Sequence, residues 1–135
     1  LRTPLVTTAD NGIGPALRCS TSANTMYFCE FNSDTTNEIV LYKVIAGTYT
    51  SLASDSTGAT PAAGDTAYAE VQGTTIIAKL NATQRISVID SAIASGRAGI
   101  FGANELQNPK CDNWEGGDFV GGDELIASRR LLSMP

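Results

Sequence analysis

Hydrophobic and polar residues alternate in short runs along the chain, and turn-forming residues separate these runs at intervals of about 8 to 12 positions. This spacing is typical of a sandwich or barrel of short strands. No segment before residue 120 has the pattern of a long helix. The sequence predicts strands over residues 3–8, 13–19, 26–31, 38–45 and 48–53, a three-strand meander over 66–90, and short strands over 97–102 and 110–115.

The meander carries the clearest pattern, because apolar residues stand at every second position over 67–71 and 76–80. Gly73 and the Asn81-Ala82 pair are the expected turns. We expect the outward face to carry Glu70, Lys79 and Arg85. In contrast, residues 26–31 are so rich in aromatic side chains that both faces of this strand are predicted to be buried.

Two segments are predicted to lie outside the sheets. Residues 54–65 are small and polar and contain Gly58, Pro61 and Gly64, so we expect them to form a surface loop that buries nothing. Residues 123–132 have charges that suit a helix, but such a helix is too short to be stable without a partner surface. The expected organisation is a β-sandwich domain over residues 1–120 and a C-terminal tail over 121–135.

Composition narrows the range of functions. A chain of 135 residues and 14.1 kDa fits one domain. Its net charge is −5, so it lacks the cationic surface that nucleic acid or anionic lipid requires. No apolar run approaches the roughly 20 residues that span a bilayer, and we expect a soluble protein without a membrane partner. The sequence contains no His, which excludes Ser-His and Cys-His nucleophiles and every zinc site that uses His.

Three cysteines, Cys19, Cys29 and Cys111, form no C-x-x-C pair. Cys19 and Cys29 flank a short polar turn and could approach one another on adjacent strands, but an odd total leaves at least one thiol unpaired. We expect them to be small buried hydrophobic residues.

Residues 64–118 combine an alternating strand that enters a Gly turn, a strand that ends at an Asn-small hairpin, Ser-Val-x-Asp, Ser-Gly-Arg-x-Gly-Ile, and a final Asp-Asn-aromatic-Glu-Gly-Gly-Asp. The strings are GDTAYAEVQGTTIIAKLNATQRISVIDSAIASGRAGIFGAN and CDNWEGGD. As a set they resemble the concanavalin A-like, laminin-G-like jelly-roll domains of bacteriophage structural proteins and some bacterial adhesive proteins. Residues 21–53 resemble the central strands of the same family. The resemblance implies an antiparallel two-sheet jelly-roll sandwich.

Domains of this family ordinarily have several strands that would precede Leu1, so the sandwich is expected to be incomplete at its N-terminus. An incomplete sandwich leaves open strand edges and an uncovered inner face. We therefore expect that this chain is part of a longer protein, or that a neighbouring subunit completes the sheet.

Glycoside hydrolysis is the enzymatic alternative, because related sandwiches cleave β-glucans with two carboxylates across a cleft. Laminarinase-like relatives carry Glu-x-Asp-x-x-Glu on one strand, and this spacing is absent here. Asp112 and Glu115 stand three positions apart, so on a strand they face opposite sides. We expect a protein that is not an enzyme.

Five residues are candidates for ligand binding. Asp112, Asn113, Trp114 and Asp118 could offer oxygens to calcium, or hydrogen bonds and a stacking ring to a sugar. The alternative is that Trp114 is a core side chain and that the two acids bond to nearby backbone amides. Arg97 could reach an acidic ligand, but a salt bridge to Asp90 or Asp112 is the expectation we favour. No cofactor is expected, and calcium is the metal that these residues could bind.

The sequence leads us to expect a non-catalytic structural or adhesive module of a bacteriophage virion, either a capsid decoration protein or a part of a tail fibre or spike. Its expected partners are other virion proteins and further copies of itself. A lectin-like module that binds a host glycan is the alternative, and a relative of the glycoside hydrolases is the third hypothesis. Tyr42, Tyr49 and Tyr68 are expected on outward faces, where they could form a contact surface.

Overall fold

The computed structural model describes residues 12–32, 38–57, 61–62, 64–102 and 115–117, and the backbone of 119–120 and 124–125. Every regular element in these residues is a β-strand. The strands are β1 (Gly12–Cys19), β2 (Met26–Asn32), β3 (Ile39–Ile45), β4 (Thr48–Asp55), β5 (Ala67–Gln72), β6 (Thr75–Leu80), β7 (Thr83–Ile89), β8 (Arg97–Gly102), β9 (Phe119–Val120) and β10 (Glu124–Leu125).

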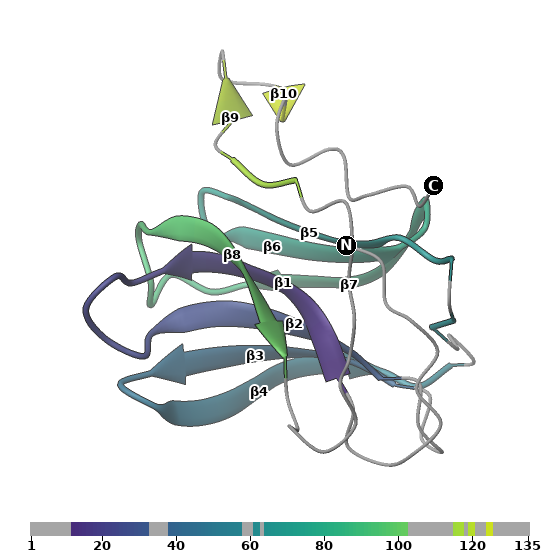
Figure 1. Cartoon of the computed structure of the whole chain (residues 1–135), viewed down its shortest axis with the longest axis horizontal. Helices are drawn as coiled ribbons and strands as arrows, with labels where there is room; N and C mark the ends of the chain where they lie inside the picture. Colours follow the sequence, from purple (N-terminus) through teal and green to yellow (C-terminus); the bar gives the residue numbers. More distant parts are fainter. Residues whose placement is uncertain are drawn as a thin grey trace.

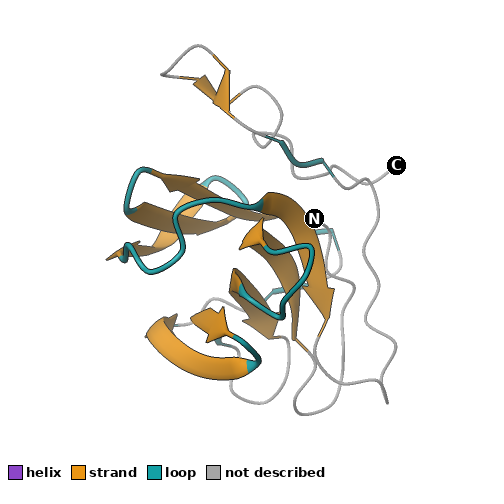
Figure 2. Ribbon diagram, turned by 90° about the vertical axis from the view of Figure 1, so that its left-hand side faces the viewer, coloured by secondary structure: helices purple, strands orange, loops and turns teal. Residues whose placement is uncertain are grey.

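The strands β1 to β8 form two antiparallel sheets (Figures 1 and 2). One sheet has five strands in the order β4-β3-β2-β1-β8, and the other has three in the order β5-β6-β7. The chain first forms the meander β1 to β4, crosses to form the meander β5 to β7, and returns so that β8 pairs with β1. The predicted all-β fold with two antiparallel sheets is confirmed.

One hydrophobic core lies between the two sheets, and alternate residues of each strand face it. Tyr27, Phe31 and Leu41 of β2 and β3 are among its largest members, and Ile76 of β6 faces them from the other sheet. Fully burying a side chain of this size contributes about 1.5–3 kcal/mol relative to its exposure. The rest of the core is supplied by Ile13, Leu17, Cys29, Ile39, Ala67, Tyr68, Ala69, Ala78, Ile86 and Ile93.

The turns predicted at Gly73 and Asn81-Ala82 are confirmed, and another tight turn joins β3 to β4. Ala46 and Gly47, between β3 and β4, have φ angles of 48° and 84°, as a type I′ hairpin requires. Gly73 and Asn81 also have positive φ angles, 58° and 56°, at the two turns of the three-stranded sheet. The strand predicted to be buried on both faces is confirmed as well, since all residues from Tyr27 to Asn32 in β2 are buried.

The predicted solvent exposure of Tyr68 and Arg85 is wrong. Tyr68 is only 7% exposed, because the Lys79 ammonium lies 4.8 Å from the centre of its ring and its hydroxyl bonds to Glu70. Arg85 does not point into solvent from the outward face. A register shift in the β6–β7 pairing turns it toward β4, where its Nε lies 2.6 Å from Asp55 Oδ2.

The loop predicted over residues 54–65 begins later than expected, and part of it is buried. Strand β4 continues to Asp55, and Pro61 is fully buried. The helix predicted over 123–132 is wrong at Glu124–Leu125, which form β10 and pair with β9. The predicted strand over 3–8, most of the one over 110–115 and the rest of the tail lie outside the described residues. The division at residue 120 stays a prediction.

The thiols of Cys19 and Cys29 are both free. The β1–β2 register places Ala16 opposite Phe28, so the two cysteines are not opposite one another. Cys29 is buried, as predicted, whereas Cys19 is half-buried and its sulfur packs beside Gly99. Cys111 lies outside the described residues.

Candidate functional site

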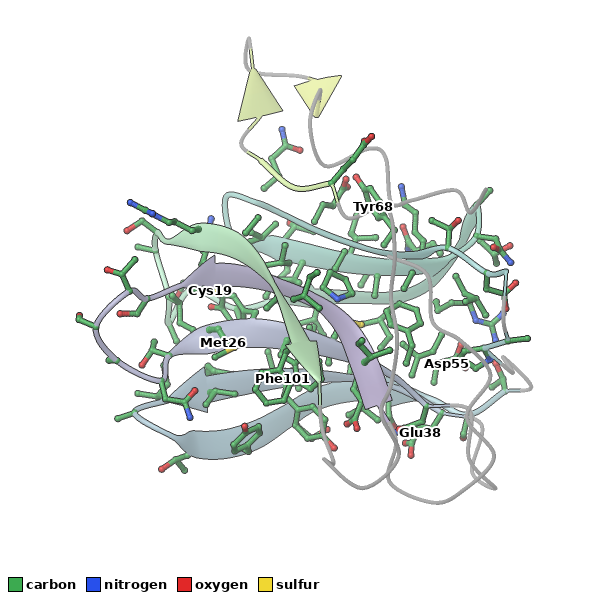
Figure 3. All side chains as sticks on the ribbon, in the orientation of Figure 1. Cys19, Met26, Glu38, Asp55, Tyr68 and Phe101 are labelled. Atoms are coloured by element: carbon green, nitrogen blue, oxygen red, sulfur yellow. The ribbon has the colours of Figure 1, made fainter. Side chains whose placement is uncertain are left out.

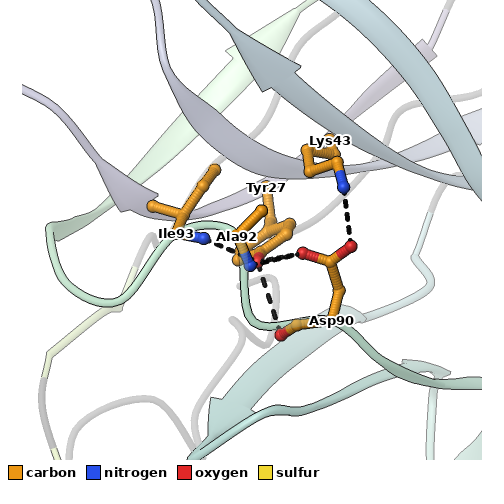
Figure 4. Close-up of polar contacts among 5 residues, drawn as sticks. All are labelled: Tyr27, Lys43, Asp90, Ala92 and Ile93. Atoms are coloured by element: carbon orange, nitrogen blue, oxygen red, sulfur yellow. Dashed lines mark hydrogen bonds and ion pairs between the residues drawn. The ribbon is translucent and has the colours of Figure 1, made fainter.

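A polar cluster ties the segment after β7 to the five-stranded sheet (Figure 4). The Tyr27 hydroxyl donates to Asp90 Oδ1 at 2.6 Å and accepts the Ile93 N–H at 3.0 Å. It also lies 3.4 Å from the Asp90 carbonyl oxygen. Asp90 Oδ2 is 2.7 Å from Lys43 Nζ, and the Ala92 N–H donates to Asp90 Oδ1 at 2.9 Å.

The surroundings of Asp90 and Tyr27 fix the protonation state of each at neutral pH. Burial alone would raise the pKa of Asp90, but hydrogen bonds from Lys43, Tyr27 and the Ala92 amide outweigh it, and the pKa lies below its ordinary value. Burial, followed by the hydrogen bond to Asp90, raises the pKa of Tyr27. Asp90 is therefore ionised and Tyr27 neutral at pH 7. Each of these groups is engaged with the others, so we interpret the cluster as a structural clamp.

Arg18 of β1 reinforces the same connection. Its guanidinium donates to the carbonyl oxygens of Ile93 and Gly73, both at 2.6 Å. Arg18 has a φ of 51° and lies in the register shift between β1 and β8. Side chains of β1, β2 and β3 therefore all bond to the segment that leads from β7 in one sheet to β8 in the other.

Four aromatic rings gather on the outer face of the five-stranded sheet, the face turned away from the core. We call Phe28, Tyr42, Tyr49 and Phe101 the aromatic face. The ring centroids of Phe28 and Phe101 are 4.2 Å apart, and those of Phe28 and Tyr42 are 6.1 Å apart in a stacked arrangement. Tyr49 lies edge-on to Tyr42 and Phe101, with both centroid distances 6.2 Å. The rings thus form a closed cycle.

The cycle shows that the five-stranded sheet curls toward this face. Phe101 is on β8 and Tyr49 is on β4, and these strands are the two edges of the sheet. In a flat sheet four strand spacings would separate the edges by roughly 19 Å. Rings whose centroids are 6.2 Å apart require the edges to bend toward each other. Figure 1 shows β8 running obliquely over β1 and β2, and Figure 3 places Phe101 at the end of this strand.

Two buried polar side chains accompany the rings on the outer face. Glu30 and Asn32 are 8% and 9% exposed and lie on the same side of β2 as Phe28. Glu30 is packed over β1 at Gly12, where a Cβ would stand 1.9 Å from Glu30 Cγ. Asn32 Oδ1 is buried and has no hydrogen-bond partner within the described part of the chain. The glycine therefore creates the space that the carboxylate occupies.

Burial and nearby carboxylates raise the pKa of one group in β3 and one in β2. Burial, and after it the Glu30 and Glu38 carboxylates, raise the pKa of Tyr42. Burial and the Glu30 carboxylate also raise the pKa of Cys29, which stays a protonated thiol. The Lys43 ammonium is engaged on the other side of the sheet with Asp90. The outer side of the sheet thus combines aromatic rings with a buried carboxylate and a buried amide.

The ligand-binding residues predicted from the sequence are not brought together by the described structure. Arg97 begins β8, is exposed and pairs with Cys19. Its expected salt bridge to Asp90 is wrong, because Lys43 holds that carboxylate, and Arg97 makes no ion pair among the described residues. Asp112, Asn113, Trp114 and Asp118 fall outside the described residues, and so does the calcium site predicted there.

Sequence reasoning found half of the aromatic face. Tyr42 and Tyr49 were predicted to point outward, and they do. Phe28 and Phe101 were missed as members of this face, although Phe28 alternates with the core residues Tyr27 and Cys29 and so must face away from the core. Phe101 had no such signal, because its neighbours in space come from strands more than 50 residues away.

Within the described residues, no group of three or more His, Cys, Asp or Glu side chains is placed to hold a metal ion. That part of the chain also has no helix long and apolar enough to cross a membrane. Searches of protein-family models, curated proteins and solved structures find no match to this chain.

Proposed function

We propose that this chain is a non-catalytic structural or adhesive module of a bacteriophage virion, built on a jelly-roll sandwich of the concanavalin A-like, laminin-G-like kind. The motifs of residues 64–118 support the phage assignment through their resemblance to that family. The two facing antiparallel sheets are consistent with it. In this reading the protein works by surface contact with other virion proteins.

The engagement of the acidic side chains supports a non-catalytic role. Asp55 and Asp90 are bound to Arg85 and Lys43, and Asp65 accepts hydrogen bonds from the Ala62 and Asn81 N–H groups. These carboxylates hold turns and strands together. A glycosidase instead needs two carboxylates that face a substrate across a cleft.

The observation that carries the proposal is the aromatic face. Phe28 at its centre is 1% exposed, whereas Tyr49 at its edge is 48% exposed. The exposed ring is therefore held in place by two others, Tyr42 and Phe101, and loses little side-chain freedom when a partner covers it. Rigid, partly exposed aromatic residues are typical anchors of protein interfaces.

Binding to virus particles tests the proposal. The purified chain is sedimented with particles of the phage that encodes it, prepared without this protein. We expect saturable, stoichiometric binding that Tyr49→Ala weakens by about tenfold or more. Ile89→Ala is the matched control, because Ile89 is 79% exposed on the outer side of the other sheet. Failure to bind particles, or an equal effect of both variants, would overturn the proposal.

A carbohydrate-binding module is the second candidate, and the Asn32 amide oxygen on the same side of β2 as the aromatic face favours it. Sugar rings stack on aromatic side chains, and their hydroxyls donate to amide oxygens such as Asn32 Oδ1. Titrating the chain with a panel of oligosaccharides, with NMR chemical shifts as the readout, distinguishes the two. Shifts that centre on Tyr49 and vanish in Tyr49→Ala support the glycan module. Particle binding with no such shifts supports the virion module.

A further inference from the structure

Strand β4 is an edge strand of the five-stranded sheet, and no described strand pairs with the outer edge of its first half. In Figure 1 it is the lowest strand of this sheet, and no described strand lies beyond it. All four residues from Thr48 to Ser51 are exposed, although their side chains alternate between the two faces. The far end of the strand is covered differently, since Asp55 is paired with Arg85 of β7. The open edge is therefore confined to residues 48–51.

The hairpin geometry decides which backbone groups point out of this edge. In a two-residue hairpin the residues that flank the turn, here Ile45 and Thr48, exchange hydrogen bonds with each other. Tyr49 is opposite Val44 and Ser51 is opposite Tyr42, so both belong to the alternate pairs that do not exchange hydrogen bonds. The N–H and C=O groups of Tyr49 and Ser51 thus point away from β3.

These groups are complementary to a second copy of themselves. If two β4 strands run antiparallel with a twofold axis beside Thr50, Tyr49 of each copy lies opposite Ser51 of the other. Each such pair exchanges two backbone hydrogen bonds, which makes four in all. The large ring of Tyr49 then meets the small side chain of Ser51 rather than a second ring. The two Thr50 residues face each other.

The sequence of this edge carries none of the usual protections against pairing. Residues 48–54 contain no charged residue and no proline. The other edge strands of the two larger sheets differ: β5 contains Glu70, β7 contains Arg85 in a register shift, and β8 begins with Arg97 beside a register shift. Like charges across a twofold axis would oppose pairing, and β4 has none to oppose it.

We propose that two copies of this chain associate through β4, with Thr50 at the twofold axis, to form one continuous sheet. This inference rests on the open strand alone and is independent of the virion proposal. The paired segment, residues 49–51, is three residues long, so its interface is smaller than the roughly 1,200 Å² at which stable complexes begin. The dimer is therefore weak in dilute solution and is favoured where copies are concentrated, as on a particle surface.

Sedimentation velocity of the full chain, over about a hundredfold range of concentration that reaches about 1 mM, tests the dimer. We expect a reversible monomer–dimer equilibrium. Ser51→Pro removes the outward N–H and should weaken the dimer about tenfold or more, whereas the control Ser51→Ala keeps that N–H and should leave the dimer unchanged. A chain that is monomeric throughout, or equal behaviour of the two variants, would overturn the proposal.

A charge-pair experiment tests the register and guards against misfolding of the proline variant. Thr50→Lys and Thr50→Glu should each be monomeric, because they place like charges directly opposite one another. Mixed together, they should form a heterodimer. Circular dichroism verifies that each variant is folded. Dimers of either charged variant alone, or a mixture that stays monomeric, would contradict the twofold axis at Thr50. Ser51→Pro keeps the four rings, so its particle binding separates this proposal from the virion one.

Discussion

The hydroxyl of Tyr27 joins three parts of the molecule at one point. Tyr27 belongs to β2. Its hydroxyl donates to Asp90, which directly follows β7, and accepts a hydrogen bond from the Ile93 N–H in the segment that leads to β8. Ile93 is only 6% exposed, so water does not readily replace the phenol as an acceptor. A buried amide without a partner costs far more than an exposed one.

Tyr27→Phe should therefore lower the free energy of unfolding by about 1–3 kcal/mol, because it removes the acceptor of the Ile93 amide and one donor to Asp90. Urea denaturation measures this change. Tyr49→Phe is the control, since it deletes a phenol oxygen from a ring that is 48% exposed, and it should stay within about 0.5 kcal/mol of the wild type. Equal losses in the two variants would show that the Tyr27 hydroxyl does not stabilise the fold.

Two glycines should respond very differently to one added methyl group. A Cβ at Gly14 would stand 1.8 Å from the backbone oxygen of Cys29, and neither strand can move without breaking the β1–β2 pairing. Gly14→Ala should cost about 3 kcal/mol or more. At Gly73 nothing lies within 4 Å, so Gly73→Ala costs only the strain of a φ of 58°, about 1–2 kcal/mol. Thermal unfolding ranks the two, and the reverse order would contradict the β1–β2 packing.

At the residue scale, the sequence identifies which side chains face the core better than it identifies which side chains contact one another. A strand alternates with period two, so Ile76, Ala78 and Ile86 could be placed in the core from the pattern alone. The partner of Arg85 could not, because it depends on a register shift in β7 and on Asp55, 30 residues earlier. A shift of one residue reverses the face of a side chain, and local pattern carries no sign of it.

At the element scale, two ion pairs fasten strands that do not pair with one another. Lys43 of β3 holds Asp90 after β7, and Arg85 of β7 holds Asp55 of β4. Hydrogen bonds from Thr57, and then Arg85, keep the pKa of Asp55 below its ordinary value. The pKa of Asp90 is lowered as well. Both acids are ionised in the folded protein at a pH where they would begin to be protonated in the unfolded chain.

This arrangement predicts how stability depends on pH. Because both folded pKa values lie below the unfolded value of about 3.9, the stabilisation is complete above that pH and is lost as the pH falls through the folded values. Urea unfolding between neutral pH and strongly acidic pH should show this loss. Asp90→Asn should be less stable at neutral pH and should lose less on acidification. An acid dependence as steep as that of the wild type would contradict a lowered pKa at Asp90.

Strand positions were predictable where the hairpins are local, as in β3–β4 and β5–β6–β7. Each of these pairings needs only a short turn with suitable residues, and the sequence displays both strands and turn together. The tail was not predictable in this way. Its charges suit a helix dipole, yet Glu124–Leu125 pair with Phe119–Val120, because backbone pairing with a nearby strand prevails over a weak helix preference.

At the scale of the whole molecule, the return of the chain to β1 creates the aromatic face. Strand β8 could be predicted as a short strand between glycines, but its place beside β1 could not, since the register joins Gly14 to Phe101 across 87 positions. That one pairing brings the two sheet edges toward each other and sets Phe101 beside Phe28 and Tyr49. A cluster of rings assembled in this way depends on which strands pair, and the pattern of a single sequence does not specify that pairing.

Proton–proton NOEs from the ring of Phe101 test the central claim, that the curled five-stranded sheet assembles an aromatic face outside the core. We predict cross-peaks from Phe101 to the rings of both Phe28 and Tyr49, which lie 4.2 Å and 6.2 Å away between centroids. Cross-peaks from Phe101 to the core residues Leu41 and Ile76, with none to Tyr49, would place β8 elsewhere and would contradict the account.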